Sequence, residues 1–153
     1  MSKERIIEIS SWVITAVLLL VLVPLSRIRE ALVVFFVKQT ITWYFGVLVV
    51  QQGLIQYPVR FFSKATNTSF TFEFFVYPSI CVLFNLYFPF AKSYLWQIVY
   101  YVGFATSITV LEVSLEKHTQ LIQYIKWSWF WTWITLLITF AMSNAFYRWF
   151  FFK

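Results

Sequence analysis

The stretch Leu111–Trp133, LEVSLEKHTQLIQYIKWSWFWTW, decides the fold because it interrupts a strongly apolar chain with charged and aromatic residues. It contains two carboxylates, the only histidine, two lysines and four of the eight tryptophans. Long apolar segments precede and follow it. Tryptophan and basic residues are enriched where membrane helices leave the hydrocarbon. The pattern therefore predicts a polar joint between two membrane-spanning helices.

The composition of the whole chain supports lipid as its solvent. Of the 153 residues, 61% are hydrophobic and 12% are charged, whereas a typical soluble domain has about 45–50% and about 25%. The net charge of +6 comes from basic residues spread singly between apolar runs, so a nucleic-acid-binding face is not expected. Cys81 is the only cysteine, which excludes an intrachain disulfide. We predict an all-α integral membrane bundle that forms a single domain over residues 1–153.

Five apolar segments predict five transmembrane helices, since a bilayer core needs about 20 helical residues. We expect spans at residues 6–25, 31–55, 72–90, 94–115 and 127–150. Pro78 lies inside the third segment, so that segment is either a kinked span or a re-entrant one, and four spans are the alternative. Residues 117–126 have helical amphipathic spacing, which predicts a short interfacial helix before the last span. Six basic residues would lie on each side of a five-span bundle, so the positive-inside rule does not predict its orientation.

Glu112 and Glu116 are the first candidate site. They are four residues apart and share a helix face, and Glu112 lies about one turn inside its span. An ionised carboxylate costs about 2.5–3.5 kcal/mol at the centre of a membrane helix, so it needs a cation, a proton or water. The pair is either a proton or cation site or a structural ion pair with Lys38, Arg60 or Lys117.

His118 lies beside the two carboxylates and would titrate near neutral pH. We favour the alternative, in which it is a polar residue of a hydrated loop. Glu112, Glu116 and His118 do not have an established metal-ligand spacing. We therefore predict no metal site and no cofactor.

Lys38 is the basic residue inside the second predicted span, seven residues from its start. A lysine at that depth either extends its ammonium group to the headgroups or lines a polar interior with Gln39 and Thr42.

Trp127, Trp129, Trp131 and Trp133 alternate with other residues at the start of the last span. At 100° per residue, Trp127 and Trp131 share one side of a helix and the other two share another. We favour an interfacial aromatic belt over an aromatic cage for a cationic ligand.

No catalytic constellation is present in the sequence. The chain has no aspartate, one histidine and no glycine-rich loop, so neither a Ser-His-Asp triad nor a two-histidine zinc motif can form. A single membrane carboxylate can still act as a base, so an enzyme is disfavoured but stays open.

Two blocks resemble a known family. YPVRFFSKATNTSFTFEFFVYPSICVLFN (57–85) and LEVSLEKHTQLIQYIKWSWFWTWITLLITF (111–140) are similar to an uncharacterised family of small multi-pass membrane proteins from Bacillus and Clostridium relatives. The resemblance runs from about residue 38 to the end. It implies a location in the bacterial cytoplasmic membrane, and it implies no activity.

Three functions fit these observations. The leading hypothesis is a non-enzymatic structural, sensory or accessory membrane protein that acts with a membrane-protein partner or as a homo-oligomer. The alternative is a small transporter or channel for protons or cations that uses Glu112 and Glu116. The third is an intramembrane lipid-modifying enzyme.

Overall fold

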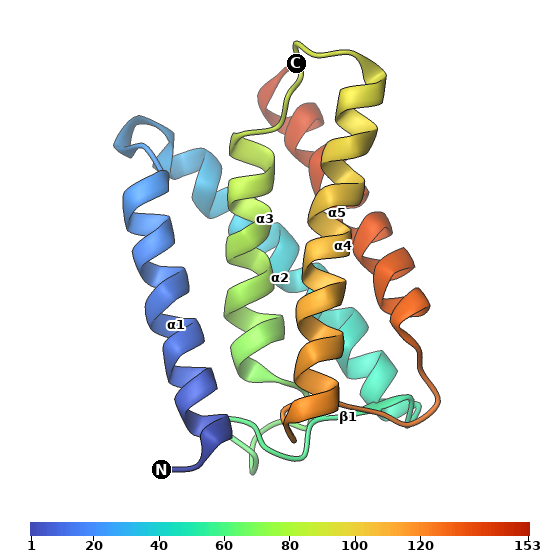
Figure 1. Ribbon diagram of the computed structural model, residues 1–153. Helices are drawn as coiled ribbons and strands as arrows, with labels where there is room; N and C mark the ends of the chain where they lie inside the picture. The colour runs from blue at the N-terminus through green and yellow to red at the C-terminus, as the bar shows by residue number, and fades with distance from the viewer.

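The computed structural model describes all 153 residues and consists of helices that run up and down the molecule (Figure 1). The elements are α1 (Lys3–Leu22), the 3₁₀ turn η1 (Leu25–Arg27), α2 (Ile28–Gln51), β1 (Ile55–Gln56), the π-helix η2 (Phe70–Val76), α3 (Tyr77–Leu86), α4 (Tyr94–His118), β2 (Gln123–Tyr124) and α5 (Trp129–Phe151). The π-helix continues directly into α3. The two termini lie at opposite ends of the bundle.

Three helices are long and apolar enough to cross a membrane: Lys3–Leu22, Leu25–Gln51 and Tyr94–His118. The apolar helix Phe70–Leu86 is shorter. The remaining helix, α5, has 23 residues but buries threonine, serine and asparagine side chains on its inner face. These polar side chains reduce its hydropathy, and they become important for the site described below.

The core is centred on α3, which packs against α1, α2 and α5. Phe84 of α3 is completely buried. Its ring lies 4.6 Å from that of Phe140 and 5.0–5.2 Å from those of Tyr100, Tyr101 and Phe104, measured between centroids. Aromatic contacts at these distances add about 0.5–1.5 kcal/mol each beyond the burial of area. Ring packing therefore holds α3, α4 and α5 together in the half of the molecule away from the N-terminus.

The predicted interfacial helix over residues 117–126 is wrong. Helix α4 continues to His118, and the chain then becomes extended and pairs with β1 as an antiparallel ribbon, Ile55 opposite Tyr124 and Gln56 opposite Gln123. Leu121 and Ile122 are buried side by side beneath it. Backbone bonds to a distant strand and burial against protein replace the lipid contacts that an amphipathic helix would have made.

Two predicted spans also end earlier than expected. The second stops at Gln51 rather than at residue 55 because Gly53 has a φ of 69°, a conformation that glycine adopts without strain. The amides of Gly53 and Leu54 donate to Val50 and Val49, which closes the helix end. The third stops at Leu86. Pro78 is in the first turn of α3, but η2 and α3 are continuous from Phe70 to Leu86, so Pro78 lies inside the helix, directly after the wider turns of η2.

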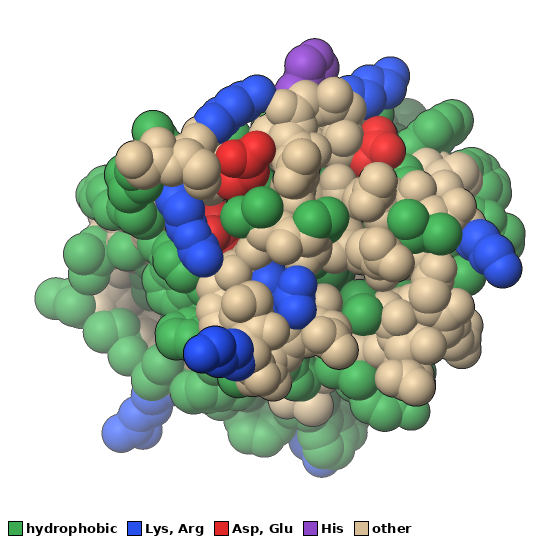
Figure 2. All heavy atoms as spheres, turned by 90° about the horizontal axis from the view of Figure 1, so that it is seen from below, with side chains coloured by type: hydrophobic (Ala, Val, Ile, Leu, Met, Phe, Trp, Pro, Cys, Tyr) green, Lys and Arg blue, Asp and Glu red, His purple; other side chains and the backbone are tan.

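The end that carries the N-terminus and the ribbon is polar at its centre and has basic side chains spread around it, with apolar side chains along the flanks (Figure 2). The basic residues of the chain segments at this end are Lys3, Arg5, Arg60, Lys64, Lys117 and Lys126. We call it the ribbon end, and the opposite one the far end.

Candidate functional site

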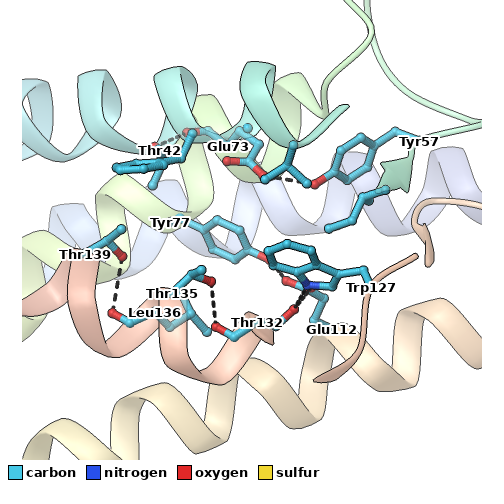
Figure 3. Close-up of a pocket in the computed structure, with 14 residues that line it drawn as sticks. Thr42, Tyr57, Glu73, Tyr77, Glu112, Trp127, Thr132, Thr135, Leu136 and Thr139 are labelled. Carbon is cyan, nitrogen blue, oxygen red and sulfur yellow. Dashed lines mark hydrogen bonds between the residues drawn. The ribbon is translucent and has the colours of Figure 1, made fainter. Parts of the chain in front are cut away.

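A cavity of about 100 Å³ lies between α2, η2, α3, α4 and α5, close to the ribbon end. Figure 3 shows Glu73 and Glu112 pointing into it from different helices. We call it the acidic cavity; its wall is formed by Thr42, Phe45, Gly46, Val49, Ile55, Tyr57, Glu73, Tyr77, Glu112, Trp127, Thr132, Thr135, Leu136 and Thr139. Much of this wall is apolar, and the polar groups of Glu73, Glu112, Tyr57 and Thr132 give a few water molecules partners in a space of this volume.

Glu112 is 7% exposed and is held by neutral donors. Its Oε1 accepts hydrogen bonds from the hydroxyls of Tyr124 (2.6 Å) and Thr132 (2.8 Å), and its Oε2 accepts one from Tyr77 (2.7 Å). The only ion pairs in the structure are Arg5–Glu8 and Arg27–Glu30. Glu112 is therefore not part of a structural ion pair, which was one of the two alternatives that the sequence left open.

Glu73 is the second carboxylate of the cavity, and no role was expected for it from the sequence. Its Oε1 accepts a hydrogen bond of 3.0 Å from the Tyr57 hydroxyl. It belongs to η2, next to the predicted start of the third span. The signal that could have revealed it is a single carboxylate inside the aromatic run FTFEFFVY.

Tyr57 and Tyr124, from the segments at the ribbon end, donate hydrogen bonds to Glu73 and Glu112, respectively. Both side chains are outside the helices. Burial first, and the neighbouring negative charge of Glu73 or Glu112 second, raise the pKa of each phenol above its ordinary value. Both phenols therefore stay protonated at neutral pH and act as hydrogen-bond donors to the cavity.

Lys38 is completely buried, so it lines the interior and does not extend to the headgroups. Its Nζ donates to the hydroxyl of Thr139 at 2.6 Å and lies 4.5 Å from the centroid of the Phe140 ring. Thr139 is also part of the cavity wall. Lys38 and Glu112, both predicted site residues, thus contact the same region of α5.

The buried polar residues of α5 form one stripe along the helix. We call it the α5 stripe, and it consists of Thr132, Thr139, Ser143, Asn144 and Tyr147. Their spacings of seven, four, one and three place them on one side of the helix. Each contacts a buried or partly buried polar group of another helix: Thr132 contacts Glu112, Thr139 contacts Lys38, Ser143 contacts Cys81, Asn144 contacts Asn85 and Tyr147 contacts Glu30.

The far end of the stripe is closed by an ion pair. Arg27 and Glu30 approach to 2.8 Å, and the Tyr147 hydroxyl lies 2.5 Å from Glu30 and 2.7 Å from Arg27. Arg27 also donates to the Leu86 carbonyl oxygen at 2.8 Å. The two ends of the stripe therefore differ. At the cavity, Glu112 has only hydroxyl partners, whereas at the far end Glu30 is paired with Arg27.

Arg60, a predicted site residue, does not reach the cavity. Its guanidinium donates to the carbonyl oxygens of Thr66 (2.6 Å) and Tyr57 (2.7 Å) and to Oδ1 of Asn67 (3.1 Å). These hydrogen bonds connect residues within the loop between β1 and η2 to one another. Its role is to shape this loop, which carries Tyr57.

Glu116 and His118 are also outside the cavity. Glu116 is partly exposed and has no hydrogen-bond partner. His118 is exposed at the last position of α4, where its Nδ1 donates to the Ser114 carbonyl oxygen at 2.9 Å and its own carbonyl accepts from Lys3. The predicted pairing of Glu116 with Glu112 in one site is therefore wrong, because Glu112 faces the cavity and Glu116 lies one turn beyond it.

The four tryptophans separate into two groups. Trp129 and Trp131 are 57% and 53% exposed, as residues of an aromatic belt would be. Trp127 precedes α5 and lines the cavity, and its Nε1 donates to Thr132 at 2.9 Å. Trp133 turns to α4 and donates to Thr106 at 3.1 Å. Trp127 thus belongs to the site, and the sequence assigned it to the belt.

Comparison of the chain with protein-family models, curated proteins and solved structures gives no match. The function is therefore inferred from the geometry of the cavity and the α5 stripe.

Proposed function

We propose that this chain is an integral protein of a bacterial cytoplasmic membrane, with five membrane-crossing helices, that carries protons between the acidic cavity and the far end of the α5 stripe. In this proposal Glu73 and Glu112 receive and release protons at the ribbon end. Lys38 and the hydroxyls of the stripe connect the cavity to Glu30 and Tyr147. This is the transporter alternative among the three functions that the sequence left open.

The observation that carries the proposal is the α5 stripe itself. Ionisable side chains inside membrane helices are costly and rare. They usually face the interior of the bundle, where they mark ion or proton pathways. The stripe extends over the 16 residues from Thr132 to Tyr147, or about 22 Å along a helix, and it contacts Glu112, Lys38 and Glu30 in turn. Ser, Thr and Asn side chains also join membrane helices by hydrogen bonds, so the contacts that distinguish this stripe are those to the ionisable side chains of Glu112, Lys38 and Glu30.

The partners of the carboxylates favour protons over larger cations. Glu112 accepts from three hydroxyls, each of which can also give up or receive a proton. The cavity has room for a few water molecules, and a chain of hydroxyls and waters can pass a proton along without moving a heavier ion.

The proposal is tested by proton flux into liposomes that contain the purified protein and a trapped pH-sensitive dye. We expect flux above that of empty liposomes for the unmodified chain. Glu112→Gln should reduce it by about tenfold or more, a change of ~1.4 kcal/mol in the barrier. The reduction is partial because Glu73 remains in the cavity, and the double substitution Glu73→Gln/Glu112→Gln should remove the flux.

The matched control is Glu116→Gln, which removes a carboxylate one turn away on the same helix that has no contact with the cavity. Its flux should equal that of the unmodified chain. Equal flux from protein-containing and empty liposomes, with the protein inserted and monodisperse, would overturn the proposal.

A further inference from the structure

The π-helix η2 is held in place by side chains of α2. The seven residues Phe70–Val76 have a wider turn than an α-helix, and such segments leave carbonyl oxygens without regular partners and often occur at functional sites. Two of these oxygens are satisfied from α2: Thr42 donates to the Glu73 carbonyl at 2.7 Å, and Gln39 donates to the Phe74 carbonyl at 2.8 Å. Figure 3 shows Thr42 beside Glu73 at the wall of the cavity.

Gly46 provides the space for the Glu73 side chain. A Cβ atom added at Gly46 would lie 3.0 Å from both Cδ and Oε2 of Glu73, which is closer than such contacts normally allow. The carboxyl group therefore fits against the bare backbone of α2. A side chain at this position would require the carboxyl group to move by a few tenths of an ångström relative to Tyr57, its hydrogen-bond donor.

We propose that Gln39, Thr42 and Gly46 are positioning residues that hold the Glu73 carboxyl group in the acidic cavity. Their spacings of three and four place them on one face of α2, the face that contacts η2. Thr42 and Gln39 donate to two consecutive carbonyl oxygens, those of Glu73 and Phe74, and Gly46 leaves room for the Glu73 side chain. This inference rests on the proposed function for its consequence, since only a proton-carrying Glu73 needs such accurate placement.

The direct test is infrared difference spectroscopy of the purified protein as pH is changed, in which a protonated carboxyl group gives a C=O stretching band. The band of Glu73 is identified by its loss in Glu73→Gln. A hydrogen bond to the carboxyl oxygen weakens the C=O bond. In Gly46→Ala we expect the band to move to higher frequency, because displacing the carboxyl group lengthens the Tyr57 hydrogen bond. The control Gly103→Ala should leave it unchanged, since an added Cβ at Gly103 meets nothing within 4 Å.

A second pair of variants tests the same inference if Gly46→Ala does not fold. Thr42→Val removes the donor to the Glu73 carbonyl, and Thr42→Ser keeps it. Thr42→Val should shift the Glu73 band, and Thr42→Ser should restore the band of the unmodified chain. Size-exclusion chromatography in detergent identifies the variants that remain folded.

Flux through liposomes separates this inference from the proposed function. If the unmodified chain carries protons, folded Gly46→Ala and Thr42→Val should lose about tenfold or more of that flux. An unshifted Glu73 band in both folded variants would overturn the positioning role, whatever the flux. Shifted bands in a chain that carries no protons would support the positioning of Glu73 and reject proton transport.

Discussion

Replacing Lys38 with methionine is expected to reduce proton flux to the level of empty liposomes while leaving the protein at least as stable as before. Glu73 and Glu112 share the cavity, so the loss of one leaves the other. Lys38 has no such substitute, because it is the only basic side chain that contacts the middle of the α5 stripe, through Thr139. We therefore expect a larger loss from this single change than from Glu112→Gln.

The stability part of this prediction follows from the burial of Lys38. The side chain is completely buried and has no ion-pair partner. Replacing a buried charge with an apolar side chain of similar shape is often neutral or stabilising. Thr139 would not lose all its partners, since its hydroxyl already lies 3.2 Å from the Leu136 carbonyl oxygen. The methionine sulfur would in turn lie beside the ring of Phe140, a favourable contact.

Flux and thermal unfolding in detergent, measured on the same preparation, check both parts. The matched control is Lys92→Met, which removes an exposed lysine from the turn between α3 and α4 and should change neither quantity. Unchanged flux in a folded Lys38→Met protein would remove Lys38 from the path. A large fall in its Tm would show that the lysine is structural.

Replacing Glu8 with leucine is expected to have the largest effect on stability. Glu8 is completely buried. Its carboxylate accepts from the Arg5 guanidinium at 2.9 Å, the Phe61 amide at 3.1 Å and the Thr71 hydroxyl at 3.2 Å. It thus fastens α1 to the loop that carries Tyr57 and to the start of η2. Leaving the Phe61 amide and the Thr71 hydroxyl without this acceptor costs about 1–3 kcal/mol for each, whereas the Arg5 guanidinium is partly exposed and can bind water.

We expect a total loss of about 2–4 kcal/mol, which corresponds to a fall in Tm of about 5–15 °C for a chain of this size. The measurement is the fraction of monodisperse protein that remains after heating in detergent. Glu4→Leu is the control, because Glu4 accepts no hydrogen bond and contributes at most about 1 kcal/mol through the helix dipole. Equal Tm values for the two variants would show that Glu8 does not fasten the loop.

The helices and two residues of the site could be predicted from the sequence. Long apolar runs around Leu111–Trp133 indicate helices because each apolar side chain favours lipid or core over water, and this depends only on local composition. Glu112 was identified for the same local reason: a carboxylate inside an apolar run needs a partner. Lys38 was identified as a buried or interfacial cation by the same argument, and burial decided between the two.

The remaining parts of the site depend on contacts between distant residues. The sequence did not indicate Glu73, because its position depends on η2, whose Glu73 and Phe74 carbonyl oxygens accept from Thr42 and Gln39 of another helix. Only Pro78, which has no N–H to donate to the Phe74 carbonyl oxygen, is a local signal for this arrangement. The ribbon replaced the predicted interfacial helix because residues 55–56 pair with residues 123–124. Glu116 was wrongly joined to Glu112 because a shared helix face does not reveal where the protein surface ends.

The sequence by itself determined that the chain is apolar and helical, and that a few ionisable side chains lie where water is scarce. These properties follow from residue type and local periodicity. Only the tertiary structure decided that Glu112 of α4, Glu73 of η2 and Lys38 of α2 line or border one cavity and meet the polar stripe of α5. The physical reason is that their partners are hydroxyls up to 101 residues away, and hydrogen bonds over such separations depend on helix packing, which local composition does not determine.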